Sequence, residues 1–223
     1  MSDNLIAYII LSISFMVVFG MGDFLLLRLR WKAEHSRKFV HIGSGLLACT
    51  FPFYFDSHWW VMAICASFVG LLYLSLKFNF LKGINQVDRK TYGSLVYPLA
   101  VYGSFYFYSS FAALSPMIFL IPILLLSIPD PAAALVGKNY PIRRFSADPH
   151  AKSWGGSGAF FLSAAVIVFI PMYASYDYGV FRSISVAVMI ALVTTAIEAF
   201  SKKGLDNLFV PLGACICLYF LMP

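Results

Sequence analysis

Runs of apolar residues long enough to cross a lipid bilayer constrain the fold of this chain more than any other feature. A membrane-spanning helix needs roughly 17–25 mostly apolar residues, and such runs recur along the whole sequence of 223 residues. Only 12% of the residues are charged, which is about half the fraction typical of soluble domains. No stretch between the runs could build a soluble core, so we expect a single transmembrane catalytic domain over residues 1–223.

The pattern predicts an all-α, polytopic helical bundle with about eight transmembrane helices. The predicted spans cover residues 5–27, 39–55, 59–77, 93–110, 116–137, 156–173, 183–200 and 207–222. Several are shorter than a full bilayer crossing, which favours packing around an interior site or a locally thinned bilayer. The first run is long for the core of a signal peptide and no basic residue precedes it, so we interpret it as a true span.

The basic residues predict the orientation of this bundle. They gather in the connections that follow the first, third, fifth and seventh predicted spans. With eight spans these connections share one side, which then holds 15 of the 16 lysines and arginines, and only Arg182 lies opposite. Because positively charged loops stay in the cytoplasm, we expect this side to be cytoplasmic and both termini to face outward.

A polar stripe enters the second predicted span. On a helix Arg37, His41 and Ser44 share one face, and Lys38 flanks it. Charged groups at membrane depth are costly, so they are candidates for function. We interpret the stripe as an anion clamp for phosphate groups. Flanking positive charge with one buried histidine explains the same residues without a site, and this alternative stays open.

Two prolines flank a carboxylate in the fifth predicted span. Pro129 and Pro131 should break the helix, with Asp130 as N-cap of a half-helix over 131–137. Broken helices occur in membranes where the backbone lines a cavity or a site. We therefore predict a functional role for Asp130, with a plain proline kink and a capping aspartate as the alternative.

A glycine- and serine-rich turn precedes the sixth predicted span. It contains Lys152, Ser153, Gly155, Gly156 and Ser157. Backbone N–H groups at such a turn and at the start of the next helix favour an anion, and the lysine adds positive charge. The spacing is not that of a Walker A loop, so the turn alone is a weak indication of phosphate binding.

Carboxylate and amide side chains surround the last predicted connection. Glu198 lies inside an apolar run, and Asp206 and Asn207 open the next helix. Oxygen ligands of this kind could hold a magnesium ion or another divalent cation. A capping aspartate and a boundary glutamate are the simpler explanation. Cations, carboxylates and glycine-rich turns nevertheless fall together on the predicted cytoplasmic side, and phosphoryl transfer from a nucleotide needs this combination.

These segments resemble the CTP-dependent lipid-alcohol kinases, a family that includes dolichol kinase, phytol kinase and the CTP-using diacylglycerol kinase of fungi. The shared blocks are Arg37-Lys38-x-x-His41, Gly93-Ser94-x-x-Tyr97-Pro98-Leu99-Ala100, Asp130-Pro131-x-Ala133-x-x-x-Gly137-Lys138, Lys152-Ser153-Trp154-Gly155-Gly156-Ser157, and Glu198 followed by Asp206-Asn207. They occur in family order over residues 37–211. Five ordered blocks are a more specific signal than any one block alone.

The resemblance implies transfer of the γ-phosphoryl group of CTP to a membrane alcohol, with Mg²⁺ as cofactor. In this hypothesis Arg37, Lys38 and Lys152 bind phosphates and act in catalysis, and Asp130 lies near the acceptor hydroxyl as base or orienting group. The remaining nucleotide-binding residues would be His41, Gly137, Lys138, Ser153, Gly155, Gly156 and Ser157. The metal ligands would be Asp130, Glu198, Asp206 and Asn207.

Two other functions remain open at this level. A cytidylyltransferase would also use CTP but would release pyrophosphate and form a CDP-lipid. A non-enzymatic transporter would suit the broken fifth span, although its polar residues should lie near the midplane rather than at one face. The expected partners are a lipid alcohol, a nucleotide and membrane lipids, with no nucleic acid. Neither the acceptor lipid nor the oligomeric state can be read from the residues.

Overall fold

The computed structural model describes residues 3–85, 92–111, 115–140, 142–145, 152–175 and 179–221. Within these ranges the chain is helical and forms no strand, apart from an isolated bridge between Arg144 and Ser153. The helices are α1(Asp3–Leu27), α2(Ala33–Ala48), α3(Phe51–Tyr54), α4(His58–Phe78), α5(Lys82–Asn85), α6(Gly93–Ser110), α7(Met117–Ser127), α8(Pro129–Asn139), α9(Trp154–Ser175), α10(Val180–Phe200) and α11(Asp206–Leu221). The all-α prediction is therefore confirmed.

Five helical segments of the described chain are long and apolar enough to cross a membrane. They are α1, α4, the continuous pair α7–α8, α9 and α10. The helix α11 is apolar but shorter. Each of the eight predicted spans overlaps helical structure, but the second covers parts of α2 and α3, and the fifth covers α7 and α8.

The second predicted span differs most from the observed helix. The helix α2 begins at Ala33, after an extended Lys32, and it ends at Ala48. The short helix α3 then restarts the chain with Pro52 in its first turn, because a proline has no N–H to continue the hydrogen-bond ladder of α2. The polar stripe that was expected to open a span therefore lies inside a helix, which fixes its side chains on one face.

The prediction that Asp130 is an N-cap is wrong. The N-cap of α8 is Ile128, and Pro129 takes the first helical position, where a missing N–H costs nothing. Hydrogen bonds run from Ile128 N to Leu124 O (3.0 Å) and from Ala132 N to Ile128 O (3.1 Å). The helical hydrogen bonds thus continue from α7 into α8, so the fifth span is not broken, and Asp130 lies in the first turn of α8.

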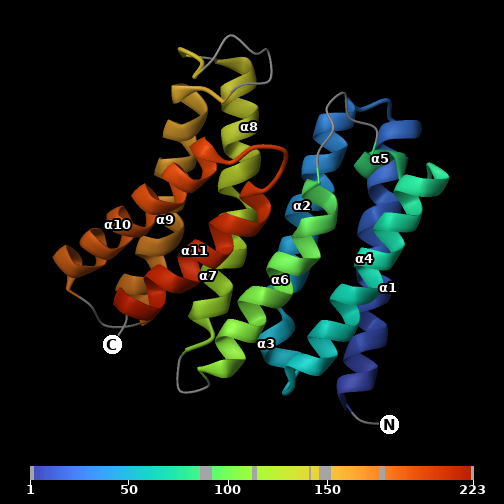
Figure 1. The fold of residues 1–223 in the computed structure, drawn as a ribbon, viewed down its shortest axis with the longest axis horizontal. Helices are drawn as coiled ribbons and strands as arrows, with labels where there is room; N and C mark the ends of the chain where they lie inside the picture. Colours follow the sequence, from blue (N-terminus) through green and yellow to red (C-terminus); the bar gives the residue numbers. More distant parts are fainter. Residues whose placement is uncertain are drawn as a thin grey trace.

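The bundle has two apolar cores that meet at α7. One core packs α1, α2, α4 and α6, shown on the right of Figure 1, and it is rich in phenylalanine. The other packs α7 to α11, on the left of the same view, around the fully buried side chains of Ile118, Phe160 and Met172. The two cores are joined by contacts of α2 with α7 and α8, and of α6 with α7 and α11.

Successive long helices run in opposite directions through the bundle. The ends of α1 and α8 and the starts of α2, α6 and α9 lie toward the upper edge of Figure 1. Both termini lie toward the lower part of the same view. The polar residues at these helix ends, Arg37 and Lys152 among them, therefore gather at one end of the molecule.

Candidate active site

A buried ion pair joins α2 to α8 near this end of the bundle. Lys38 Nζ donates a hydrogen bond to Asp130 Oδ2 at 2.5 Å, and Lys38 is only 5% exposed. His41 Nε2 lies 3.8 Å from the same carboxylate oxygen and 2.9 Å from the carbonyl oxygen of Leu126. A buried pair of this kind is strongly destabilised when one partner is removed. The two α2 side chains thus fix the position of Asp130.

A second charged cluster joins the starts of α9 and α11 to the end of α10. Lys152 Nζ lies 2.6 Å from Glu198 Oε1 and 2.8 Å from Asp206 Oδ2. It also donates to the backbone carbonyl of Glu198. Ser157 Oγ donates to Glu198 Oε2 at 3.4 Å. One ammonium group therefore holds the carboxylates of two successive helices, from which Lys152 is 46 and 54 residues away in the chain.

The environment of Lys152 keeps it charged. Burial by itself would lower the pKa of its ammonium group, but the carboxylates of Asp206 and Glu198 outweigh burial and raise that pKa above its ordinary value. The two clusters are also neighbours in space, because α8, which carries Asp130, packs against α9, which begins two residues after Lys152. The clusters therefore form a single charged site.

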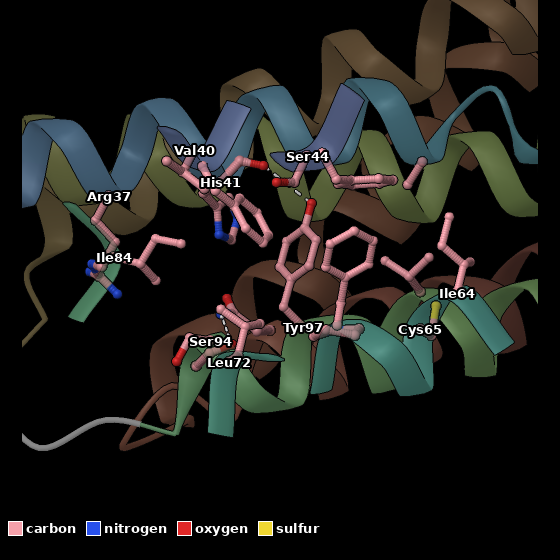
Figure 2. Close-up of a pocket in the computed structure, with 18 of the residues that line it drawn as sticks. Arg37, Val40, His41, Ser44, Ile64, Cys65, Leu72, Ile84, Ser94 and Tyr97 are labelled. Carbon is pink, nitrogen blue, oxygen red and sulfur yellow. Dashed lines mark hydrogen bonds between the residues drawn. The ribbon is translucent and has the colours of Figure 1, made fainter. Parts of the chain in front are cut away.

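A cavity opens beside this site, between α1, α2, α4 and α6. It encloses about 700 Å³ that protein atoms do not fill, including the part open to the exterior. Figure 2 shows the two ends of the cavity: Arg37, His41 and Ser94 lie at one end, and Ile64 and Cys65 at the other. The cavity is polar at one end and apolar along the rest of its length.

The polar end of the cavity touches both charged clusters. His41 lines the cavity and lies beside Asp130. Asn207 also lines it, follows Asp206 in the chain and donates from Nδ2 to the carbonyl oxygen of Gly93 at 3.0 Å. Arg37 Nε and Ser44 Oγ are buried and have no hydrogen-bond partner within the described ranges. Two polar groups on the cavity face of α2 are thus left for a ligand.

The glycines of the predicted phosphate turn bring α8 and α9 into close contact. A Cβ atom on Gly156 would lie 2.8 Å from the carbonyl oxygen of Ala133, and one on Gly137 would lie 3.4 Å from the Cα of Gly156. A Cβ atom on Gly155 would meet the carbonyl oxygen of Tyr140 at 2.7 Å. Small residues let helix backbones approach in this way, so packing alone explains these glycines.

The other predicted nucleotide-binding residues differ in their surroundings. Ser153 is buried, and its hydroxyl accepts a hydrogen bond from Gly156 N at 3.2 Å, as in a helix cap. Lys138 is exposed on the last turn of α8 and joins neither cluster. The role of both residues, and of the glycines, in nucleotide binding stays a prediction.

The predicted metal ligands are divided between the two clusters. Glu198 and Asp206 flank the ammonium group of Lys152, whereas Asp130 pairs with Lys38. Across the described ranges no group of three or more histidine, cysteine or acidic side chains surrounds a common point. Magnesium is commonly held by one or two carboxylates together with substrate phosphates. The Glu198–Asp206 pair therefore fits an ion that arrives with a nucleotide better than a permanent metal centre.

Sequence reasoning assigned no role to two residues that shape the site. Glu34 pairs with Arg37 at 2.7 Å, and its position three residues earlier on a helix is a readable signal. Tyr97 donates from its hydroxyl to the carbonyl oxygen of His41 at 3.2 Å, which links α6 to α2 across the cavity. The second of the shared sequence blocks contains Tyr97, but nothing in that block indicates its partner.

One known protein relates this geometry to an activity. The phytol kinase of Synechocystis sp. (strain ATCC 27184 / PCC 6803 / Kazusa) is 32% identical over 189 residues, which cover 82% of this chain and 78% of that protein. The chain belongs to the family of CTP-dependent lipid-alcohol kinases. Membership makes it an integral membrane kinase that phosphorylates a lipid alcohol. No family model and no solved structure matches this kinase.

Proposed function

We propose that this kinase transfers the γ-phosphoryl group of CTP to the hydroxyl of a polyprenol or dolichol, a phytol-like alcohol or a diacylglycerol, at the cytoplasmic face of the membrane. The polar end of the cavity carries the proposal. There His41 lies 3.8 Å from Asp130, and Asn207 adjoins Asp206. An alcohol in the cavity would present its hydroxyl to both charged clusters at once.

Asp130 would act on the acceptor side of the reaction. Its carboxylate adjoins the polar end of the cavity and is held by Lys38 and His41. A carboxylate in this position can orient the hydroxyl and accept its proton as the O–P bond forms, as the catalytic aspartate of protein kinases does. The bond from the γ-phosphorus to the bridging oxygen then breaks, and CDP leaves.

The positive side chains would act on the donor side. Arg37, Lys38 and Lys152 would bind the phosphates of CTP, with the start of α9 and the Gly137–Lys138 end of α8 beside them. Glu198 and Asp206, with Asp130 or Asn207, would hold Mg²⁺. When bound, the ion would neutralise charge that develops on the phosphate oxygens. Lys152 would then exchange its carboxylate partners for phosphate.

The proposed topology has eight spans and two outward termini. It counts α2, α6 and α11 as short spans in addition to the five longer ones. The positively charged helix ends at one end of the bundle support this orientation. CTP would then reach the site from the cytoplasm, while the lipid enters sideways from the bilayer.

The test uses purified protein and CTP labelled on its γ-phosphate. Phytol, dolichol and diacylglycerol are supplied as acceptors, and ATP replaces CTP in a parallel reaction. We expect a labelled lipid phosphate and free CDP. A further reaction supplies phosphatidate as a lipid-phosphate acceptor, and labelled pyrophosphate with a CDP-lipid there would instead establish a cytidylyltransferase. The absence of any labelled lipid from every alcohol would reject the proposed activity.

A further inference from the structure

The cavity has the shape of a lipid-tail site with a definite depth. Its α2 wall runs from Arg37 through His41 and Ser44 to Ala48, residues that share one helix face. At a rise of about 1.5 Å per residue, Arg37 and Ala48 lie about 16 Å apart along the axis of α2. One leaflet of a bilayer with a hydrocarbon core about 30 Å thick has nearly this depth.

The deep end of the cavity is closed by apolar side chains. It is lined there by side chains from α1, α2, α3 and α4, and the most buried are Ala48, Phe51, Ile64 and Cys65. Ala48 and Ile64 are 0% exposed, and Phe51 is 1% exposed. Among the described residues that line this end, only the weakly polar thiol of Cys65 could favour water over a hydrocarbon chain.

A single residue narrows the cavity between its two ends. Tyr97 extends from α6, and its hydroxyl donates to the backbone carbonyl of His41 on α2. Its ring meets the His41 ring edge-on, with the ring centroids 4.7 Å apart. Figure 2 shows Tyr97 with Arg37, His41 and Ser94 on one side and Ile64 and Cys65 on the other. The Tyr97 ring therefore takes up part of the width between α6 and α2, and a single hydrocarbon chain needs less of that width than two chains side by side.

We propose that this cavity holds the hydrocarbon tail of a single-chain alcohol, and that Ala48 and Cys65 at its closed end set the longest tail that fits. The hydroxyl then lies among Arg37, His41 and Asn207, where Arg37 Nε has no partner in the described part of the chain. This inference rests on the proposed kinase activity and adds to it a selection by tail length and tail number.

The first test changes the closed end and measures selectivity. The variants Ala48→Leu and Cys65→Phe are compared with wild type on geraniol, farnesol, geranylgeraniol and phytol, with diacylglycerol as a two-chain acceptor. Filling the closed end should lower the ratio of kcat/KM for geranylgeraniol over geraniol by about 10–100-fold, a typical effect of a few methylenes in an apolar pocket. Wild type should prefer the longer single-chain alcohols to diacylglycerol.

The matched control is Ala66→Phe. Ala66 follows Cys65 on α4 but is exposed on the outer surface of the bundle, so its ratio should stay within about twofold of wild type. An equal change in all three variants, an unchanged ratio in the closed-end variants, or a preference for diacylglycerol would overturn the inference while the kinase activity stands.

The second test requires no turnover and no variant that has to fold. A geranylgeraniol analogue with a photoreactive diazirine at the end of its tail is bound to wild-type protein and irradiated, and the labelled peptides are mapped. We expect labelling at Ala48, Phe51, Ile64 or Cys65. Labelling confined to outward-facing residues such as Ala66 would overturn the inference. Phosphorylation of no alcohol would instead remove the proposed function, and the labelling pattern would still decide whether the cavity binds the tail.

Discussion

The two halves of the bundle are both rich in apolar residues, but they differ in what these residues surround. In the half built from α7 to α11, Ile118, Phe160 and Met172 are fully buried, and glycines bring the backbones of α8 and α9 together. In the half built from α1, α2, α4 and α6, phenylalanine rings such as Phe15 and Phe68 (centroids 4.9 Å apart) border a cavity. The first of these halves holds Lys152 between its two carboxylates, and the second borders the space that can admit a lipid.

The largest expected effect on activity concerns Asp130, whose ion pair with Lys38 joins α8 of one half to α2 of the other. Replacing Asp130 by asparagine removes the carboxylate that faces the polar end of the cavity while its shape is kept. We expect kcat to fall by about 10²–10⁴-fold, the usual contribution of a positioned acid or base. Steady-state assays with CTP and phytol would measure the loss.

The matched control for this change is Asp56→Asn, at an exposed aspartate before α4, which should leave kcat within about twofold. If Asp130→Asn retained full activity and the wild-type thermal midpoint, the reaction would not take place at Asp130.

The second prediction compares the same truncation in the two halves. Phe160→Ala opens a void among the helices α7 to α11 and should lower the free energy of unfolding by about 3 kcal/mol. This value is at the lower end for buried phenylalanines, because in the unfolded state the side chain would contact lipid or detergent rather than water. Phe68→Ala enlarges a cavity that already exists, so fewer packing contacts are lost there and we expect a smaller loss than for Phe160→Ala.

Reversible unfolding in mixed micelles would measure both values. Equal losses, or a larger loss for Phe68→Ala, would show that the first half is as tightly packed as the second.

The third prediction concerns the glycine contact that closes α9 onto α8. Gly156→Ala places a Cβ atom 2.8 Å from the carbonyl oxygen of Ala133. The helices must then separate, and we expect the free energy of unfolding to fall by about 2 kcal/mol, within the usual range for overpacking. Because the start of α9 also carries Ser157 beside Glu198, kcat should fall as well.

Gly158→Ala is the control on the same helix, since a Cβ atom there meets no described atom within 4 Å. It should be neutral or stabilising by about 0.5–1 kcal/mol, because alanine favours a helix over glycine. Similar destabilisation by both substitutions would point to helix propensity or to the loss of glycine as such, rather than to the α8–α9 contact.

The smallest expected effect is the pH dependence contributed by Lys152. A pKa raised in the folded state means that the folded protein holds this proton more tightly than the unfolded chain does. The stabilisation by its ion pairs is therefore complete from neutral pH up to the ordinary value of 10.5. It is lost only as the pH rises through the folded-state pKa.

The measurement is the thermal midpoint of wild type minus that of Lys152→Met across alkaline pH, with exposed Lys202→Met as the control. The Lys152 difference should stay level to pH 10.5 and shrink above it, while the Lys202 difference stays near zero. A Lys152 difference that shrinks already near neutral pH would contradict the raised pKa.

Much of the fold could be predicted because apolar runs are a local property. Residues 93–110 form a helix with the predicted bounds, and the shared face of Arg37, His41 and Ser44 is confirmed by their common place on the cavity wall. The capping role of Asp130 was mispredicted because two prolines at alternate positions allow two helix starts. Which start is used depends on how α7 continues into α8.

The candidate site was only partly predictable. The residue types that carry phosphoryl chemistry were readable, and so was their common end of the bundle. Their pairing was not, because the partners of Asp130 lie 92 and 89 residues away in the chain, on α2, and no local pattern encodes such a contact. Gly155 and Gly156, at the start of α9, were also predicted to bind phosphate. Their close contacts with Tyr140 and Ala133 explain the need for glycine by packing.

By itself the sequence determined that this chain forms membrane-embedded helices with their basic ends gathered on one side, since hydrophobicity and charge act residue by residue. Only the tertiary structure decided that Lys38 meets Asp130, that Lys152 lies between Glu198 and Asp206, and that a cavity beside them is left open. Packing decides these features because each depends on which side chains meet across helices that are distant in the sequence.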